Sequence, residues 1–198
     1  MDRRNFLALV TVSGLWSLLQ ACAGDDAGSA DTTVPATTSG GFAHARSSLS
    51  RRSPERAIAA DAAHAVNTFG ADLYRRLAAG GDVNLVVSPA SILLALAMTR
   101  AGAAGATAEE MDRVLHADEA GADPMAIHPA ANALSAQLES RSGTFTVGGD
   151  RLDVQLTIAN SLWGQQGLTW SPAFLELLAA EYGAGIFLVD YITDPDRA

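Results

Sequence analysis

Residues 84–115, with the sequence NLVVSPASILLALAMTRAGAAGATAEEMDRVL, determine the fold that we expect for this chain. The run NLVV at 84–87 predicts a short buried strand. Ser88 and Pro89 then supply a helix cap and a first-turn residue, and the segment after them is apolar on nearly every side, which predicts a central helix. Thr107 opens a capping box, TAEE, so another helix is expected after the glycine-containing turn.

Helical periodicity continues on both sides of this stretch. Upstream, Ser53 and Pro54 resemble a cap and a first turn, and apolar residues then recur at three- and four-residue steps over residues 58–77. Downstream, Asp123 and Pro124 signal a further helix, which Pro129 is expected to bend or delay. These patterns predict two amphipathic helices that pack against the central one.

The pattern changes to alternation near residue 150, which predicts strands. A turn at the glycine pair 148–149 would precede a strand with four apolar residues on one face, namely Leu152, Val154, Leu156 and Ile158. A capped helix is expected over residues 171–183, and the run GIFLVDY at 185–191 is apolar on both faces, which predicts a covered strand. The chain is therefore expected to have an α+β fold.

The bulk composition limits the possible functions. The chain has 198 residues, 48% hydrophobic and 18% charged, which is enough for one globular domain with a core. All 13 basic residues are arginines, which excludes mechanisms that need a lysine. The formal net charge of −9 argues against a nucleic-acid partner. The four histidines, at 44, 64, 116 and 128, lack the spacing of a zinc site, so no metal and no cofactor is expected.

Residues 1–22 have the layout of a signal peptide, with a charged start and an apolar run over 6–19. The sequence RRNFL at 3–7 resembles a twin-arginine export motif, and LQAC at 19–22 resembles a bacterial lipobox. Cys22, the only cysteine, is the expected lipidation site, which predicts an exported, cell-surface protein whose only contact with a membrane is its lipid anchor. The alternative is cleavage near Ala23, which would give a free secreted protein.

The residues after the signal are expected to form two parts. Residues 23–53 are rich in Gly, Ser, Thr, Ala and Asp without an apolar period, which predicts a flexible linker. Residues 54–198 would form the folded part.

Three polar residues in apolar surroundings are candidates for a site. Ser88 lies between a predicted strand and a predicted helix, but VVSPA lacks the glycines of a nucleophile elbow, so capping explains this serine better than catalysis. Ser91 and Asn160 lie within apolar segments and need partners if they are buried. They would either bond to their own backbone or belong to a buried network that joins two elements.

Two long segments resemble the serpin family of protease inhibitors. The first is residues 84–115, quoted above, and the second is LTIANSLWGQQGLTWSPAFLELLAAEYGAGIFLVDY at 156–191. The resemblance implies amino-terminal helices packed on part of a mixed β-sheet. It implies inhibition of a serine or cysteine protease by insertion of a cleaved reactive loop into the main sheet. It also implies no catalytic residue, and it places Ser88, Ser91 and Asn160 at the polar "shutter" beneath the sheet opening.

The last residues, TDPDRA at 193–198, have a helix start signal, and the resemblance implies that a covering helix begins there. On this interpretation the chain is a partial serpin domain that is truncated before the reactive loop. Inhibition is therefore not expected, and the strands are expected to have open edges. The alternative is a surface-tethered, non-inhibitory binding or scaffold domain, for which the lipobox-like start and the linker suffice.

Overall fold

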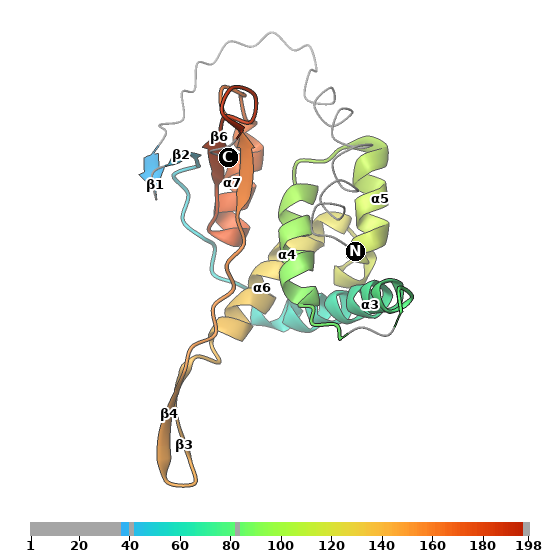
Figure 1. The fold of residues 1–198 in the computed structure, drawn as a ribbon, viewed down its shortest axis with the longest axis vertical. Helices are drawn as coiled ribbons and strands as arrows, with labels where there is room; N and C mark the ends of the chain where they lie inside the picture. Colours follow the sequence, from blue (N-terminus) through green and yellow to red (C-terminus); the bar gives the residue numbers. More distant parts are fainter. Residues whose placement is uncertain (1–36, 40–41, 82–83, 196–198) are drawn as a thin grey trace.

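The computed structural model of this protein describes residues 37–39, 42–81 and 84–195. A group of helices stands beside a small sheet, and a two-stranded hairpin extends away from both (Figure 1). This arrangement confirms the expected α+β class. The predicted signal peptide 1–22 with Cys22, linker residues 23–36 and the last three residues lie outside the described residues.

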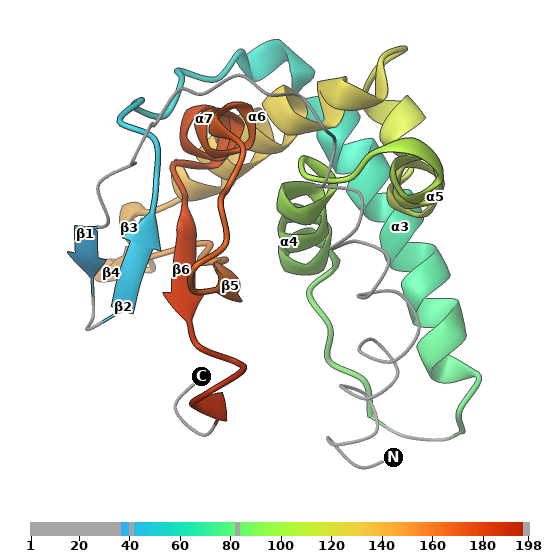
Figure 2. The ribbon, with the colours of Figure 1, turned by 90° about the horizontal axis from the view of Figure 1, so that it is seen from above.

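The helical part is built around the 20-residue helix α3 (Ala59–Ala78), which contacts α4, α5 and α6 (Figure 2). The core that these helices share contains Phe69, Leu93, Leu115, Ile127 and Leu134. The helical elements, in chain order, are η1 (Arg56–Ile58), α3, α4 (Pro89–Arg100), α5 (Gly105–Leu115), η2 (Ala117–Ala120), η3 (Pro124–Ala126) and α6 (Ile127–Glu139).

Two of the predicted helix starts are confirmed. Ser88 is the N-cap of α4, and its hydroxyl accepts from the backbone N–H of Ser91. Asp123 caps the short turn η3 by accepting from the N–H of Met125 at 2.9 Å, and α6 follows directly. Pro129 lies in the first turn of α6, where an N–H would have no partner within the helix, so the proline is tolerated.

Two other predictions for the same stretch are wrong. α5 begins at Gly105 after Ala104, two residues before the proposed cap Thr107, and no side chain caps it. The segment 84–87 is not a buried strand, since Val86 is 97% exposed. An apolar run becomes a strand only beside a neighbouring strand, and none of the described residues pairs with this one.

Four strands form a mixed sheet in the order β1-β2-β6-β5, namely β1 (Thr37–Ser39), β2 (Phe42–Ala45), β6 (Ile186–Val189) and β5 (Leu162–Gln165). β5 is parallel to β6, and the crossover between them contains α7 (Pro172–Leu177) and the π-helical turn η4 (Leu178–Tyr182). Leu175 and Leu178 pack on one face of this sheet. The predicted strand and the helical segment within 171–183 are confirmed, and Gly183 ends the helix with a φ of 63°. The predicted cap is wrong, because the side chain of Ser171 accepts no bond from the first turn.

The flexible linker predicted for residues 23–53 does not extend to residue 53. β2 pairs antiparallel with β6, and His44 and Ala45 are buried. Residues 42–52 need no apolar period, because backbone pairing attaches β2 to the sheet and Arg51 and Arg52 attach the following residues to the helices. Composition alone does not reveal these contacts.

The predicted strand with four apolar residues on one face is also different in the structure. Its first part belongs to β4 (Asp150–Val154), which forms a hairpin with β3 (Gly143–Val147). Residues 155–161 have no regular structure. The turn at the glycine pair is confirmed. However, every residue of both strands is exposed, so the apolar face is not buried against the helices.

Candidate functional site

The three polar residues that the sequence singled out lie on two elements. Ser88 precedes α4 and Ser91 lies in its first turn, whereas Asn160 lies in the irregular segment that leads into β5. None of the hydrogen bonds found in the described part of the chain joins Asn160 to either serine. The structure therefore links Ser88 with Ser91, and the shared role of all three residues stays a prediction.

Ser88 and Ser91 satisfy each other locally. The hydroxyl of Ser88 donates to the Oγ of Ser91 at 3.0 Å and accepts from the Ser91 backbone N–H at 3.4 Å. Ser88 is exposed and Ser91 is half-buried. This is the local bonding that the sequence left open for Ser91, and it gives Ser88 the geometry of a helix cap.

A row of aromatic rings runs across the sheet on the face opposite α7. His44, Phe187 and Trp163 are cross-strand neighbours on β2, β6 and β5. The ring centroids of His44 and Phe187 are 4.5 Å apart, and those of Phe187 and Trp163 are 4.8 Å apart, with both pairs stacked. Phe42 meets Trp163 edge-on at 4.9 Å. Because Trp163 is half-exposed at the β5 end, the row ends at an open edge of the sheet.

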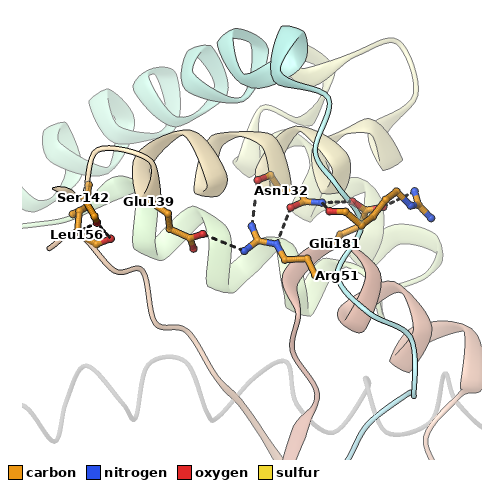
Figure 3. Close-up of polar contacts among 7 residues, drawn as sticks. Arg51, Asn132, Glu139, Ser142, Leu156 and Glu181 are labelled. Carbon is orange, nitrogen blue, oxygen red and sulfur yellow. Dashed lines mark hydrogen bonds and ion pairs between the residues drawn. The ribbon is translucent and has the colours of Figure 1, made fainter.

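A cluster of polar side chains holds the segment after β2 against the helices (Figure 3). The Nε of Arg51 donates to the side-chain oxygen of Asn132 at 2.8 Å, and the amide nitrogen of Asn132 donates to Glu181 at 3.2 Å. Arg52 forms an ion pair with Glu181 at 2.7 Å. Asn132 and Glu181 are both buried, so each depends on these partners for the polar contacts that water would otherwise supply.

A second buried polar pair lies close to this cluster. The Nδ1 of His128 lies 2.7 Å from the hydroxyl of Tyr182, and its Nε2 has no partner among the described residues. Burial, together with the nearby Arg100, lowers the pKa of His128 to about 4. Burial also raises the pKa of Tyr182. Both side chains are therefore neutral at pH 7, which is the form that a buried site accommodates best.

The described residues show no candidate metal cluster and no helix suited to a membrane. No cluster of three or more His, Cys, Asp or Glu side chains that could hold a metal ion is present in the described part of the chain. Of the helices that the structure describes, none has both the length and the apolar character needed to cross a membrane. A hollow of about 390 Å³ lies between Leu49, Arg52 and the helices α6 and α7, and it borders the polar cluster.

The sequence analysis did not identify the polar cluster. Asn132 lies on the face of α6 next to apolar residues, and Glu181 precedes the predicted helix stop at Gly183. The signal available in the sequence was one asparagine and one glutamate among alanines in predicted helices, together with the adjacent arginines at 51 and 52. Which of these residues pair could be seen only in the three-dimensional structure, because Arg51 and Asn132 are 81 residues apart in the chain.

Comparison with known proteins covers the part of the chain that contains α4, α5, α7 and β6. A family model described as serpin (serine protease inhibitor) matches residues 64–198. An uncharacterized serpin-like protein of Thermococcus kodakarensis is 36% identical over 135 residues, which are 68% of this chain and 29% of that protein.

Vertebrate relatives give the same result. The leukocyte elastase inhibitor of Bos taurus is 32% identical over 136 residues, and that of Xenopus tropicalis is 30% identical over 131 residues. These alignments cover 68% and 66% of this chain, respectively, and 32% of each relative. The matched part of the chain thus spans about a third of the length of these relatives. On the extent of the family match and on these identities, the chain belongs to the serpin family.

Proposed function

We propose that this chain contributes to a serpin-type inhibitor of serine or cysteine proteases. The observation that carries the proposal is the family match over residues 64–198, together with leukocyte elastase inhibitors that are about 30% identical. The inhibitor acts as a suicide substrate whose cleaved reactive loop inserts into the main sheet. The protein itself is not an enzyme and uses no cofactor, because the attacking nucleophile belongs to the protease.

In this proposal residues 54–198 are the amino-terminal third of such a domain. The share of the relatives that is matched, 29% to 32%, supports this assignment. The outer edge of β5 also supports it, since no strand of the described residues pairs there. An unpaired edge is a template for strand addition, and the rest of the domain would supply that strand. Residues 1–198 alone are then expected to lack inhibitory activity.

The three polar residues would serve the opening of the sheet rather than catalysis. Ser88 and Ser91 would form one side of the shutter at the start of α4, and Asn160 the other side, before β5. The Ser88–Ser91 contact at 3.0 Å and the half-buried position of Asn160 are compatible with such a role. Partners from the rest of the domain would complete the network.

The amino terminus places the inhibitor outside the cell in this proposal. Residues 1–22 direct export, and Cys22 carries a lipid that holds the domain at the cell surface. Nothing beyond this anchor contacts the membrane. The partner is an extracellular protease, and no nucleic acid is involved.

A second candidate function is a surface-tethered binding or scaffold domain without inhibitory activity. The β3–β4 hairpin favours it, because Phe145, Leu152 and Val154 are exposed on one face of a hairpin that extends from the body (Figure 1). Exposed apolar surface of this kind is typical of a protein-binding element.

The two functions are separated by incubation with trypsin-like, elastase-like, subtilisin-like and papain-like proteases, followed by electrophoresis in SDS. The protein would be expressed from its reading frame together with the DNA that follows the Ala198 codon, and residues 1–198 alone would be the matched control. An SDS-resistant covalent complex of the longer product, absent from the control, is the expected result. The absence of a complex with every protease would favour the binding domain.

A further inference from the structure

The segment 42–52 lies outside the part of the chain that the family model matches, which begins at residue 64. It nevertheless adds a strand to the sheet, because β2 pairs with the edge of β6 that β5 does not use. The approach of the two backbones is close. A Cβ added at Gly185 would lie 2.6 Å from the carbonyl oxygen of Ala45, so only glycine fits there.

The side chains of β2 match the two faces of the sheet. Ala45 is buried with Leu175 and Ile186 beneath α7, where only a small residue leaves room for the helix. His44 lies on the other face and stacks on Phe187 at 4.5 Å. The edge of β6 therefore fits an extended segment in which small residues alternate with flat aromatic ones, as in FAHA at 42–45.

A second attachment follows directly in the chain. Besides its bond to the side chain of Asn132, Arg51 donates to the backbone carbonyl of Asn132 at 3.3 Å and forms an ion pair with Glu139 at 3.5 Å. The backbone N–H of Arg52 donates to Ala180 at 2.7 Å, and its carbonyl accepts from Asn132 at 3.0 Å. Figure 3 shows Arg51 reaching both Asn132 and Glu139 of α6, with Glu181 of η4 beside Asn132.

The connection between the two attachments has one further bond to the body, from the Arg46 guanidinium to the carbonyl of Gly183 at 3.3 Å. Residues 46–50 have no regular structure, and Leu49 lies half-exposed within them. The contacts of Arg51 and Arg52 hold the chain only a few residues after β2, so β2 stays near β6. Its pairing with β6 is then intramolecular and has a high effective concentration. Loss of those contacts leaves the β1–β2 hairpin attached to β6 only by the four-residue strand β2 and the bond of Arg46, and an isolated two-stranded hairpin is only marginally stable.

We propose that residues 42–52 form a strap that closes the outer edge of β6 against strand addition by other chains, and that the contacts of Arg51 and Arg52 with Asn132 and Glu181 form the lock. When the lock opens, β2 leaves and the edge of β6 accepts an extended peptide of the same alternating pattern. The natural occupant is this chain's own segment. A second copy that supplies the segment in trans is the competing occupant.

The test uses the full chain with both lock arginines replaced, R51Q/R52Q, and the charge-matched control R141Q/R151Q near the hairpin. Amide hydrogen exchange is measured by mass spectrometry over residues 42–45, 186–189 and 59–78. The expected result is that only R51Q/R52Q exchanges faster, by about tenfold or more, at β2 and β6, with α3 unchanged. Unchanged exchange at 186–189, or equal acceleration in α3, would overturn the proposal.

A labelled synthetic peptide of residues 42–52 then probes the edge itself by fluorescence anisotropy. It should bind R51Q/R52Q about tenfold or more tightly than the wild type, and the same peptide with both arginines replaced by glutamine should bind more weakly. A second variant, A45D, displaces β2 while it keeps both arginines, and it should also expose the edge. Equal binding of the native peptide to wild type and both variants contradicts the strap.

The oligomeric state of the wild type shows whether the β6 edge is occupied by the chain's own residues 42–52 or by those of a second copy. Size-exclusion chromatography of the full chain should show that the wild type associates no more than R51Q/R52Q at any concentration, because the strap closes the β6 edge and the open β5 edge is common to both. A dimer that R51Q/R52Q dissociates would show that the strap acts in trans, and it would overturn closure in cis.

Discussion

α6 and the β3–β4 hairpin are consecutive in the chain and have opposite environments. In α6 even polar side chains are buried, including His128 and Asn132, whereas in the hairpin even Phe145 and Leu152 are exposed. Both segments had a clear apolar face in the sequence. The comparison shows that periodicity identifies the face of an element, while the neighbours in space decide whether that face is buried.

The difference has a physical origin in how each element satisfies its backbone. The hairpin pairs five residues of each strand with the other, from Gly143 with Val154 to Val147 with Asp150, so its inter-strand hydrogen bonds form without the body and its outer backbone groups face solvent. α6 lies between α3, α4 and η4, and its side chains must fit all three. Substitutions in α4 and α6 should therefore affect global unfolding, and substitutions in the hairpin should not.

The largest expected difference comes from the same substitution in the two regions. Leu93 in α4 is 1% exposed and Leu152 in β4 is 50% exposed. Leu93→Ala should lower the free energy of unfolding by about 2–5 kcal/mol, because it leaves a cavity in the core. Leu152→Ala should change it by less than about 0.5 kcal/mol. Chemical denaturation measures both values, and similar losses would mean that the hairpin packs on the body in solution.

Acid should destabilise the body through His128. Its pKa is lowered from 6.5 to about 4, mainly by burial, so between these values the unfolded chain binds a proton that the native chain does not. The free energy of unfolding should thus fall as the pH falls from 6.5 to 4, by about 3 kcal/mol in total. Denaturation at several pH values should show this slope in the wild type.

A variant separates His128 from other acid effects. His128→Gln should remove most of the slope between pH 6.5 and 4, because glutamine does not titrate in this range. A slope that persists in His128→Gln would assign the acid sensitivity to another group.

Polar contacts should show the same contrast between the regions. Asn132 bonds Arg51, Arg52 and Glu181 from a buried position, and Asn132→Leu should cost about 2 kcal/mol because it leaves Glu181 short of a donor. Thr144 bonds Asp153 at 2.6 Å on the exposed hairpin, and Thr144→Val should cost less than about 0.5 kcal/mol. Thermal or chemical unfolding measures both, and equal costs would contradict the contrast.

Much of the helical part could be predicted from the sequence. The Ser88 cap, the Asp123 start, the Gly183 stop and the covered strand at β6 all carry local signals that act within a few residues. The predictions that were wrong are those that depend on which residues an element contacts or where a helix begins. The run at 84–87 has a strand composition but no neighbour among the described residues, and Thr107 lost its capping role because α5 begins earlier, at Gly105.

The candidate site could be predicted only in part, for the same reason. The contact of Ser88 with Ser91 is local, three residues apart, and the sequence anticipated it as helix capping. The pairing of β2 with β6 and of Arg51 with Asn132 joins residues far apart in the chain, and no local pattern announces either. The linker prediction failed at residues 42–52 because a short strand of small and aromatic residues has the composition of a tether.

The smallest expected difference uses two glycines with nearly the same backbone. Gly148 in the hairpin turn has a φ of 64° and Gly183 at the end of η4 has a φ of 63°. A side chain in this left-handed conformation costs about 1 kcal/mol at either position. Gly183→Ala should lower the free energy of global unfolding by about that amount, with a further small cost because its Cβ would lie 3.4 Å from the Cδ of Arg51.

Gly148→Ala carries the same local strain, but the hairpin can open without the body, so global unfolding should not change. Its effect should appear instead as faster amide exchange within β3 and β4, with β6 and α3 unaffected. A global loss equal to that of Gly183→Ala would show that the hairpin and the body unfold as one cooperative unit, because local opening of the hairpin would then no longer relieve the strain before the core is lost.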